Sequence, residues 1–232
     1  MKNIFAEKLL QKVAADYNVI ASNFSASRPR VWPLMERFTA LAKNGDRVID
    51  VGCGNGRAYQ LFADRAIEYE GVDVSEQLIA IAREKVRDQL ATFRVGSALK
   101  LPFENASFDT AFSFAMIHHI PSRERRLVAF REVRRVLKPG GVFVLTSWDL
   151  LQSRHAWRVL LAAVPAALGL GALDIGDAYI PWLAGGANVQ RYCHAFTLRG
   201  LQRLATEAGF LIQESGRSGG NLYIVARGPI KA

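Results

Sequence analysis

Cysteine is scarce in this sequence, long apolar runs are absent, and acidic residues are outnumbered by basic ones. The two cysteines, Cys53 and Cys193, cannot form a disulfide framework, and neither belongs to a CxxC zinc motif. We therefore expect a reducing, cytoplasmic setting. The most apolar stretch, residues 159–173, has fifteen residues, which is short of the roughly twenty that cross a bilayer. The sequence therefore predicts no membrane span.

The charge balance is basic, with 30 Lys and Arg against 21 Asp and Glu, a net charge of +9. Half of the 232 residues are apolar, which is typical of a globular protein with a packed core. This length favours one large domain, or a domain with an added cap. The positive excess fits nucleic acid, a membrane surface or an anionic small molecule as partner, and it fits a role in solubility alone equally well.

From residue 47 onward, short apolar strands alternate with amphipathic helices. The expected strands are residues 48–51, 69–74, 91–95, 108–114 and 142–148. The expected helices are residues 55–64, 75–86 and 122–138. A further helix, 197–208, precedes a closing hairpin of residues 210–215 and 221–226. This alternation predicts an α/β fold, a doubly wound and mostly parallel sheet of seven strands.

Two segments fall outside that alternation. Residues 1–45 read as a helical cap over the open edge of the site, before a core of residues 46–148. Residues 149–196 read as a substrate-side insertion, with an apolar helix pair at 159–173, buried or acting as a lid, and a Gly/Pro-rich loop at 181–190. Residues 197–232 complete what we expect to be a single domain.

A glycine-rich turn follows the first expected strand. Asp50 ends the strand, and Gly52, Gly54 and Gly56 follow with GxGxG spacing. Glycines here let the backbone approach a ligand closely, and ligands of open α/β sheets bind beyond the carboxyl ends of the strands. The dinucleotide pattern GxGxxG fails because Arg57 holds the position of its last glycine. The turn predicts a cofactor site, with Asp50 either facing a cationic ligand or serving as a plain strand-end charge.

A second acid ends the next strand. Asp73 stands 21 residues after Gly52, where a carboxylate can accept hydrogen bonds from both hydroxyls of a ribose. The alternative is an acid that stabilises the N-terminus of the helix following Ser75.

Together with LPFENASFD before the fourth strand and REVRRVLKPGGVFVL around the fifth, these residues resemble the class I S-adenosylmethionine-dependent methyltransferases over residues 45–148. The resemblance implies S-adenosyl-L-methionine as cofactor, with Asp50 and Gly52 at its methionine end and Asp73 at its ribose. Ser97 and Ala98 would lie beside the adenine. Ser97 stands where that family commonly has an acid, and a hydroxyl is the weaker acceptor. The resemblance assigns four more residues to the cofactor site: Tyr17, Gly54, Gly56 and Phe114.

Outside this core, the sequence resembles the tRNA wobble-uridine carboxymethyl methyltransferases, which esterify a 5-carboxymethyl group. The similar segments are residues 17–21, 24–33, 113–126, 147–152, 191–196 and 220–221. The resemblance implies tRNA as substrate and a small zinc-binding activator protein as partner. Three positions depart from the family pattern: Ile120 replaces Trp, Asp149 replaces a small residue, and Cys193 replaces Tyr.

The chemistry of such a reaction indicates which residues could take part in it. A carboxylate is already ionised at neutral pH, so its methylation needs orientation and positive charge, but no general base. Arg28, His118 and His194 are the candidate catalytic residues; Arg28 could instead bind the carboxylate of the cofactor. Successive strand residues face opposite sides, so at most one of His118 and His119 should face the site. Adjacent histidines without a carboxylate at helical spacing predict no metal site.

Two other functions are compatible with the same sequence. In the first, a small-molecule or lipid-precursor methyltransferase, residues 156–173 would line an apolar pocket. In the second, the fold binds no cofactor and serves as a binding subunit, although the intact glycine-rich turn argues against it.

Overall fold

A seven-stranded sheet organises the computed structural model, which describes residues 1–184 and 188–230. Its order is β3-β2-β1-β4-β5-β9-β8. The strands are β1 (Arg47–Val51), β2 (Glu68–Asp73), β3 (Ala91–Val95), β4 (Phe108–Phe114), β5 (Leu137–Trp148), β8 (Leu211–Ser218) and β9 (Asn221–Arg227). The first five are parallel and β9 runs antiparallel to both β5 and β8. The doubly wound, mostly parallel sheet and its closing hairpin are therefore confirmed. Residues 185–187 of the expected Gly/Pro-rich loop, and residues 231–232, lie outside the described residues.

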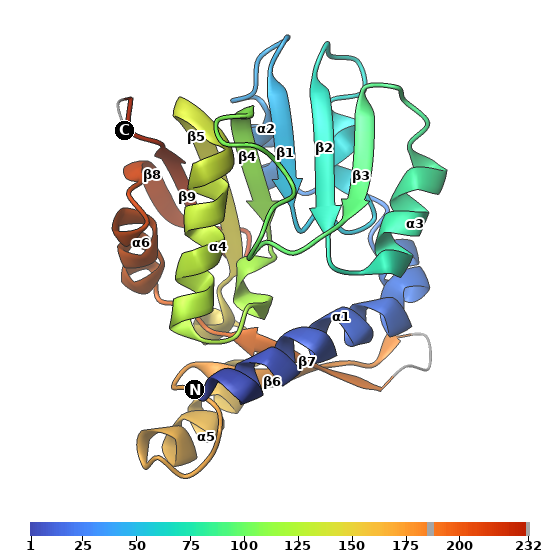
Figure 1. Cartoon of the computed structure of the whole chain (residues 1–232). Coiled ribbons are helices and arrows are strands. Elements are labelled where there is room, and N and C mark those ends of the chain that lie inside the picture. The colour runs from blue at the N-terminus through green and yellow to red at the C-terminus, as the bar shows by residue number, and fades with distance from the viewer. Residues whose placement is uncertain (185–187, 231–232) are drawn as a thin grey trace.

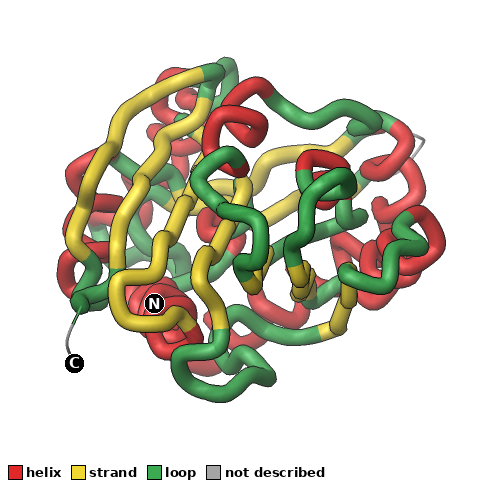
Figure 2. The backbone as a smooth tube through the Cα atoms, turned by 90° about the horizontal axis from the view of Figure 1, so that it is seen from above, coloured by secondary structure: helices red, strands yellow, loops and turns green. Residues whose placement is uncertain are grey.

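Helices cover both faces of the sheet (Figure 1; Figure 2, from above). The helices are α1 (Asn3–Ala26), α2 (Pro33–Thr39), α3 (Glu76–Lys85), α4 (Arg123–Val136), α5 (Ala156–Ala167) and α6 (Leu198–Glu207). One buried cluster joins α4 and α6 to the sheet, through side chains such as Phe130 and Leu201. Another joins α2 and α3 to the opposite face, through Phe38 and Ile79. Side chains of β1 alternate between the two clusters, Val48 entering one and Ile49 the other, as the pleat requires.

Polar caps fix where two of these helices begin. The Ser75 hydroxyl accepts a hydrogen bond from the Leu78 amide (3.2 Å), and the Thr197 hydroxyl accepts one from the Gly200 amide (3.0 Å). Each satisfies an amide that has no partner within its own helix. The expected helix starts at residues 75 and 197 are confirmed.

The N-terminal helix lies across the carboxyl ends of the parallel strands (Figure 1). Asn18 of α1 accepts a hydrogen bond from the Ser75 hydroxyl at the start of α3 (2.7 Å). Lys12 of α1 donates to the Gln190 carbonyl (3.0 Å), which lies in a separate hairpin of β6 (Asp177–Trp182) and β7 (Val189–His194). The expected helical segment over the site is confirmed, and α1 connects the sheet to the substrate-side hairpin.

The expected helix at residues 55–64 is wrong. The structure has only a 3-10 helix, η1 (Arg57–Leu61), which follows Gly56 in the left-handed region (φ +72°). Its backbone bonds span three residues, from the Tyr59 amide to the Gly56 carbonyl (3.0 Å) and from the Phe62 amide to the Tyr59 carbonyl (2.8 Å). This tight turn brings Phe62 into the core and directs the chain into β2.

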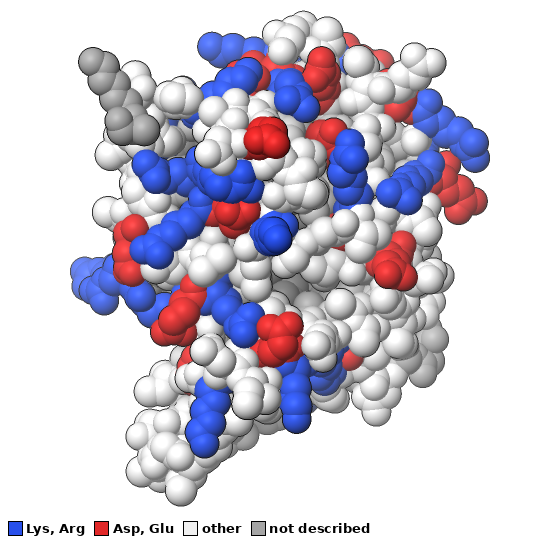
Figure 3. Space-filling model, in the orientation of Figure 1, with Lys and Arg blue, Asp and Glu red and all other residues white. Residues whose placement is uncertain are grey.

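The helix pair expected at residues 159–173 is wrong, and so is its burial, whereas the alternative role as a lid stays a prediction. The structure has α5 there, ending before Gly169. The side chains of Leu160, Leu161 and Val164 are 61–65% exposed. In Figure 3, α5 forms the mostly uncharged lobe at the lower left. Among the described residues, no helix has the length and apolar character of a membrane span.

Candidate active site

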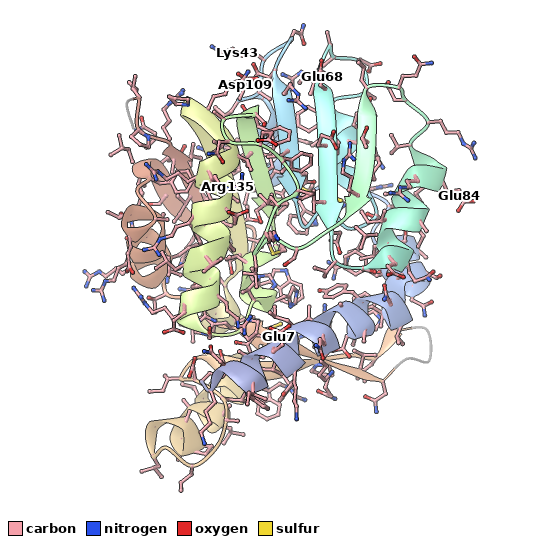
Figure 4. The ribbon with its side chains drawn as sticks, viewed as in Figure 1. Glu7, Lys43, Glu68, Glu84, Asp109 and Arg135 are labelled. Carbon is pink, nitrogen blue, oxygen red and sulfur yellow. The ribbon has the colours of Figure 1, made fainter. Side chains whose placement is uncertain are left out.

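A cleft of about 360 Å³ lies at the carboxyl ends of the strands, under α1. Figure 4 shows its lining residue Glu7 on α1, whereas Lys43, Glu68 and Asp109 mark the opposite end of the sheet. Eight of the predicted cofactor residues line this cleft: Tyr17, Asp50, Gly52, Gly54, Asp73, Ser97, Ala98 and Phe114. Gly56 does not line it. Its positive φ shapes the turn, and a Cβ there would lie 2.9 Å from the Phe93 ring.

Asp50 lines the cleft and has one carboxylate oxygen without a hydrogen-bond partner among the described residues. The side chain is only 2% exposed, and its Oδ2 accepts a hydrogen bond from the Tyr69 hydroxyl (2.7 Å). Its Oδ1 is buried and has no hydrogen-bond partner among the described residues. Burial raises the pKa of Asp50 to about 7, against the opposing Tyr69 hydrogen bond. A cationic ligand group would restore the charge that burial disfavours.

The Asp73 carboxylate is hydrogen-bonded to the glycine-rich turn and to the start of α3. Its Oδ2 accepts from the Gly54 amide (2.9 Å) and its Oδ1 accepts from the Ser75 amide (2.9 Å). Each carboxylate oxygen can accept two hydrogen bonds, so each retains capacity for a ribose hydroxyl. The predicted ribose role and the alternative role at the start of the helix are therefore compatible in one side chain.

Gly52 permits the close approach of the first turn to Met116. Its φ is +82°, and a Cβ there would lie 2.3 Å from the Met116 Cγ and 2.5 Å from its Cβ. We predict that Gly52→Ala lowers the free energy of unfolding by about 2–3 kcal/mol, through the left-handed backbone and this overlap together. Gly54→Ala is the matched control, since φ is +55° but the nearest atom is 3.8 Å away; its cost should be about 1 kcal/mol. Urea denaturation of both variants measures the difference, and equal losses would show that Met116 moves freely.

The end of the cleft that the resemblance assigns to the adenine has a hydroxyl where that family commonly has an acid. Ser97 lines it beside Ala98, and the Ser97 hydroxyl accepts from the Leu99 amide (3.2 Å). The hydroxyl retains an O–H donor and a second lone pair for a ligand.

Arg57, which breaks the dinucleotide glycine pattern, lines the same cleft. Its guanidinium lies 4.7 Å from the centre of the Trp32 ring, and its Nη1 is buried without a hydrogen-bond partner in the described part of the chain. Burial and nearby Arg28 lower the pKa of Arg57 to about 10, so it remains a cation at neutral pH. The sequence marks Arg57 only as the residue in place of a glycine; its position in the cleft suits the carboxylate of an amino-acid ligand.

The histidine pair lies in a 3-10 turn, η2 (Ile117–His119), and not on a strand. The expected alternation of faces therefore does not apply, but only His119 lines the cleft. His119 Nδ1 lies 2.8 Å from the Tyr192 carbonyl, and its Nε2 lies 2.7 Å from the Tyr17 hydroxyl. Burial lowers the pKa of His119 to about 3. The ring is thus neutral, donates from Nδ1 and accepts from Tyr17.

His118 packs behind the cleft. Its ring lies 4.7 Å from the Trp148 ring, and its Nδ1 accepts a long hydrogen bond from the Trp148 amide (3.5 Å). Burial lowers the pKa of His118 well below its usual range, so it supplies no positive charge at neutral pH. His118, His119 and Cys193 place ligand atoms within 4.8 Å of one another. Both ring nitrogens of His119 are hydrogen-bonded, and the expectation of no metal site stays a prediction.

A second cavity, of about 650 Å³, adjoins the first. The two cavities share Arg28 and Trp148 in their walls. Trp182 and Arg191, from the β6–β7 hairpin, line the second cavity. These two strands lie in a segment that we expected to contain only a helix and a loop. The alternating residues of Asp177–Trp182 and Val189–His194 were a weak strand signal, interrupted by Pro181.

Positive charge at this junction comes from arginine. Arg28 lies 4.6 Å from the Phe24 ring and 5.5 Å from the Trp182 ring. Burial lowers the pKa of Arg28, and Arg191 lowers it further. The ion pairs among the described residues include neither arginine. The junction is therefore prepared for an anion.

The third candidate catalytic residue, His194, is not brought to either cavity. Its Nδ1 lies 2.7 Å from Asp177 Oδ1, which also accepts from the Tyr192 hydroxyl (2.7 Å). The geometry assigns His194 to a hydrogen-bond network that holds the hairpin, while its catalytic role stays a prediction without support from its position.

Comparison with known proteins places this arrangement in a family. Residues 49–145 match the family described as a methyltransferase domain. A putative methyltransferase of Encephalitozoon cuniculi is 32% identical, over 90% of this chain and 91% of that protein. A tRNA (carboxymethyluridine(34)-5-O)-methyltransferase of Schizosaccharomyces pombe is 29% identical, over 90% and 93%.

The mouse protein tRNA (carboxymethyluridine(34)-5-O)-methyltransferase ALKBH8 is 38% identical over 59% of this chain, and the matched part is 20% of its length. This chain thus matches about a fifth of that protein. Among solved structures, a SAM-dependent methyltransferase of Methanosarcina mazei has a TM-score of 0.70 at 24% identity, covering 87% of this chain and 100% of that one. The complex between the Haloferax volcanii Trm112 methyltransferase activator and the putative methyltransferase gives 0.65 at 18%, covering 92% and 97%. These likenesses show the fold.

The residues of the cleft fit the cofactor of this family. Asp50 offers an unpartnered oxygen for an ammonium group, and Arg57 an unpartnered nitrogen for a carboxylate. Asp73 keeps acceptor capacity for a ribose. The chain belongs to the methyltransferases, and its cofactor is S-adenosyl-L-methionine.

Proposed function

We propose that this enzyme methylates the carboxylate of a 5-carboxymethyl group on the wobble uridine of tRNA. The observation that carries the proposal is the second cavity, which meets the cofactor cleft at Arg28 and Trp148. Indole rings suit a nucleobase, and unpaired guanidinium groups suit a carboxylate. Two of the similar proteins, from fission yeast and mouse, carry this activity in their names.

In this reaction the main task of the chain is to position the acceptor carboxylate. S-adenosyl-L-methionine, when bound, would supply an electrophilic methyl group, and the task of the chain is to hold the acceptor oxygen beside it. Arg28 stands in the wall between the two cavities, where it can orient a carboxylate. Neither His118 nor His119 adds charge, since burial lowers the pKa of both.

We predict that the single-turnover rate of methyl transfer, with cofactor saturating and the chain in excess over the RNA, is constant between about pH 6 and pH 9. A carboxylate acceptor with a pKa near 4 is ionised throughout this window. His119, with a pKa lowered to about 3, and Tyr17, with a pKa raised to about 12, keep their protonation states there as well. Rapid quenching across the pH range measures the rate. A rise approaching tenfold per pH unit would instead indicate an acceptor that must lose a proton.

A small-molecule or lipid-precursor acceptor is less well supported. That alternative requires residues 156–173 to line an apolar pocket, yet none of them lines either of the two cavities. The second cavity instead has Arg154 and His155 at its wall. Figure 3 shows basic and acidic side chains interspersed over the face viewed, so we expect RNA contacts to gather around this cavity and not on that face.

A cytoplasmic location and a small activator subunit belong to the same proposal. Both described cysteines are free thiols, which fits a reducing compartment. The fold neighbour from Haloferax volcanii was solved with an activator of methyltransferases. We propose a partner of that kind here, and co-purification with a tagged copy of this chain tests it.

The test uses purified protein, methyl-labelled S-adenosyl-L-methionine and undermethylated tRNA at low salt, followed by mild base. We expect label to enter tRNA and leave as methanol, because an ester is hydrolysed by base. Label that resists base would exclude a carboxylate acceptor. Failure to label tRNA, with cofactor binding intact and an activator added, would overturn the RNA substrate. Phosphate contacts also predict weaker binding as salt rises.

A further inference from the structure

Arg191 is a buried cation whose hydrogen-bonding groups are only partly used. Its side chain comes from β7 and is 5% exposed. The guanidinium lies 5.0 Å from the ring centres of both Trp148 and Trp182. Its Nε and Nη1 have no hydrogen-bond partner in residues 1–184 and 188–230. The two indole rings hold the guanidinium group in place but cannot accept its hydrogen bonds.

Asp149 complements Arg191 within the second cavity. It is 4% exposed, and its Oδ2 accepts from Arg217 Nε (2.9 Å). Its Oδ1 is buried and unpartnered among the described residues. Arg217 pairs with one oxygen of this carboxylate, and the other oxygen is a hydrogen-bond acceptor that remains unused. Because Asp149 lines the cavity, this oxygen calls for a donor on the ligand.

The two groups together specify a ligand that has a hydrogen-bond acceptor at one edge, for Arg191, and a hydrogen-bond donor at another, for Asp149. Leaving either one buried without a partner is costly, and a ligand that satisfies both recovers that cost. A carboxylate matches the fork of Arg191, and a ring N–H matches the free oxygen of Asp149. A uracil ring with a carboxymethyl substituent has both groups, and flat rings stack on indoles.

We propose that the second cavity binds the acceptor base at two points: Arg191 binds its carboxylate, and Asp149 accepts a hydrogen bond from its ring N3–H. This inference rests on the proposed function and names the residues that select the acceptor. The family that this sequence resembles has a small residue at the position of Asp149. The role of Asp149 is therefore inferred from its contacts in this structure and not from the family.

The experiment compares three anticodon stem-loop RNAs that differ at the wobble base. One carries 5-carboxymethyluridine, one the neutral 5-carbamoylmethyl analogue, and one the N3-methylated form of the acid. We expect the wild-type chain, with its cofactor and any required activator, to bind the first about 100-fold more tightly than the second and about 30-fold more tightly than the third.

Each variant should lose one preference and keep the other. Arg191→Met should bind acid and amide alike but still reject the N3-methylated RNA. Asp149→Ala should do the reverse, and Asp149→Asn, which keeps an acceptor oxygen, should recover part of the loss. Arg158→Met, a charge deletion outside both cavity linings, should keep both preferences. Cofactor affinity, measured for every variant, shows that the fold is intact.

The outcomes separate this inference from the proposed function. Equal binding of all three RNAs by the wild-type chain would overturn the carboxylate acceptor itself. A wild-type preference that survives in Arg191→Met and Asp149→Ala would leave the reaction standing and overturn the roles assigned to these two residues. If both cavity variants lose both preferences while still binding cofactor, independent recognition of the two edges is wrong.

Discussion

An Asp50→Asn chain will bind S-adenosyl-L-methionine at least about a hundredfold more weakly than the wild-type chain, and without ligand it will be the more stable of the two. The first effect follows because Asp50 lines the cleft in which the cofactor would bind, and its Oδ1 has no hydrogen-bond partner among the described residues. Removing one member of a buried charge pair costs about 3–5 kcal/mol. The second effect follows because, without cofactor, the buried charge of Asp50 opposes folding.

The pH dependence of stability separates this explanation from a general loss of structure. Burial raises the pKa of Asp50 from 3.8 to about 7 in the folded chain. Between these values the folded state binds more protons than the unfolded state, so Asp50 makes the unliganded protein less stable as pH rises. The advantage of Asp50→Asn should be small below pH 4, grow through this window, and level off above pH 7 at about 2–4 kcal/mol.

Urea denaturation of both proteins at pH 5 and pH 8 measures the stability, and isothermal titration measures the cofactor affinity. The neutral side chain keeps an oxygen that can accept from the Tyr69 hydroxyl, which makes it the matched substitution. A variant that is less stable at pH 8 than at pH 5, relative to wild type, would show that the carboxylate contributes structurally instead.

The second prediction concerns Arg28, which the sequence left with two roles. Arg28→Met should slow methyl transfer about a thousandfold and change cofactor affinity less than about threefold, because Arg28 lies where the two cavities meet. Arg57→Met should show the reverse pattern, with cofactor affinity reduced about tenfold or more, because Arg57 lines only the cofactor cleft of the two. Methionine keeps the unbranched apolar part of each arginine side chain, which can still pack beside the aromatic rings.

Single-turnover kinetics and equilibrium dialysis of the cofactor distinguish the two arginines. If Arg28→Met weakens cofactor binding as strongly as it slows the reaction, then Arg28 binds the carboxylate of the cofactor, the other role that the sequence allows. The two variants are informative together, since each serves as the charge-matched control for the other.

The sheet and its cofactor turn could be predicted because local signals and tertiary structure agree there. Apolar strands and capped helices each favour one conformation, the glycines after Asp50 permit the turn, and the sheet buries its apolar side chains as expected. The prediction of a helix at residues 55–64 was wrong, because the turn at Gly56 and the burial of Phe62 outweigh helical propensity.

The acceptor side could be predicted only in part. Arg28 was found because it stands in a recognisable motif, but Arg191 and Asp149 become meaningful only when folding brings them to one cavity. The sequence does not distinguish His119 from His118, because no local signal tells which member of an adjacent pair a 3-10 turn will direct to the cleft. Exposure of α5 was missed for a similar reason, since apolar composition cannot show whether anything covers a helix.

The position of α1 has a thermodynamic consequence. This helix provides Tyr17 to the cofactor cleft and contacts α3 through Asn18. Through Lys12 it also contacts the β6–β7 hairpin, which lines the second cavity. A movement of α1 that favours one ligand therefore alters the binding of the other. By linkage the coupling is reciprocal: in the reaction that we propose, whatever factor the cofactor contributes to RNA affinity, the RNA contributes to cofactor affinity. Two ligands that share no lining residue on α1 would still affect each other's binding, because both sites depend on the position of this one rigid helix.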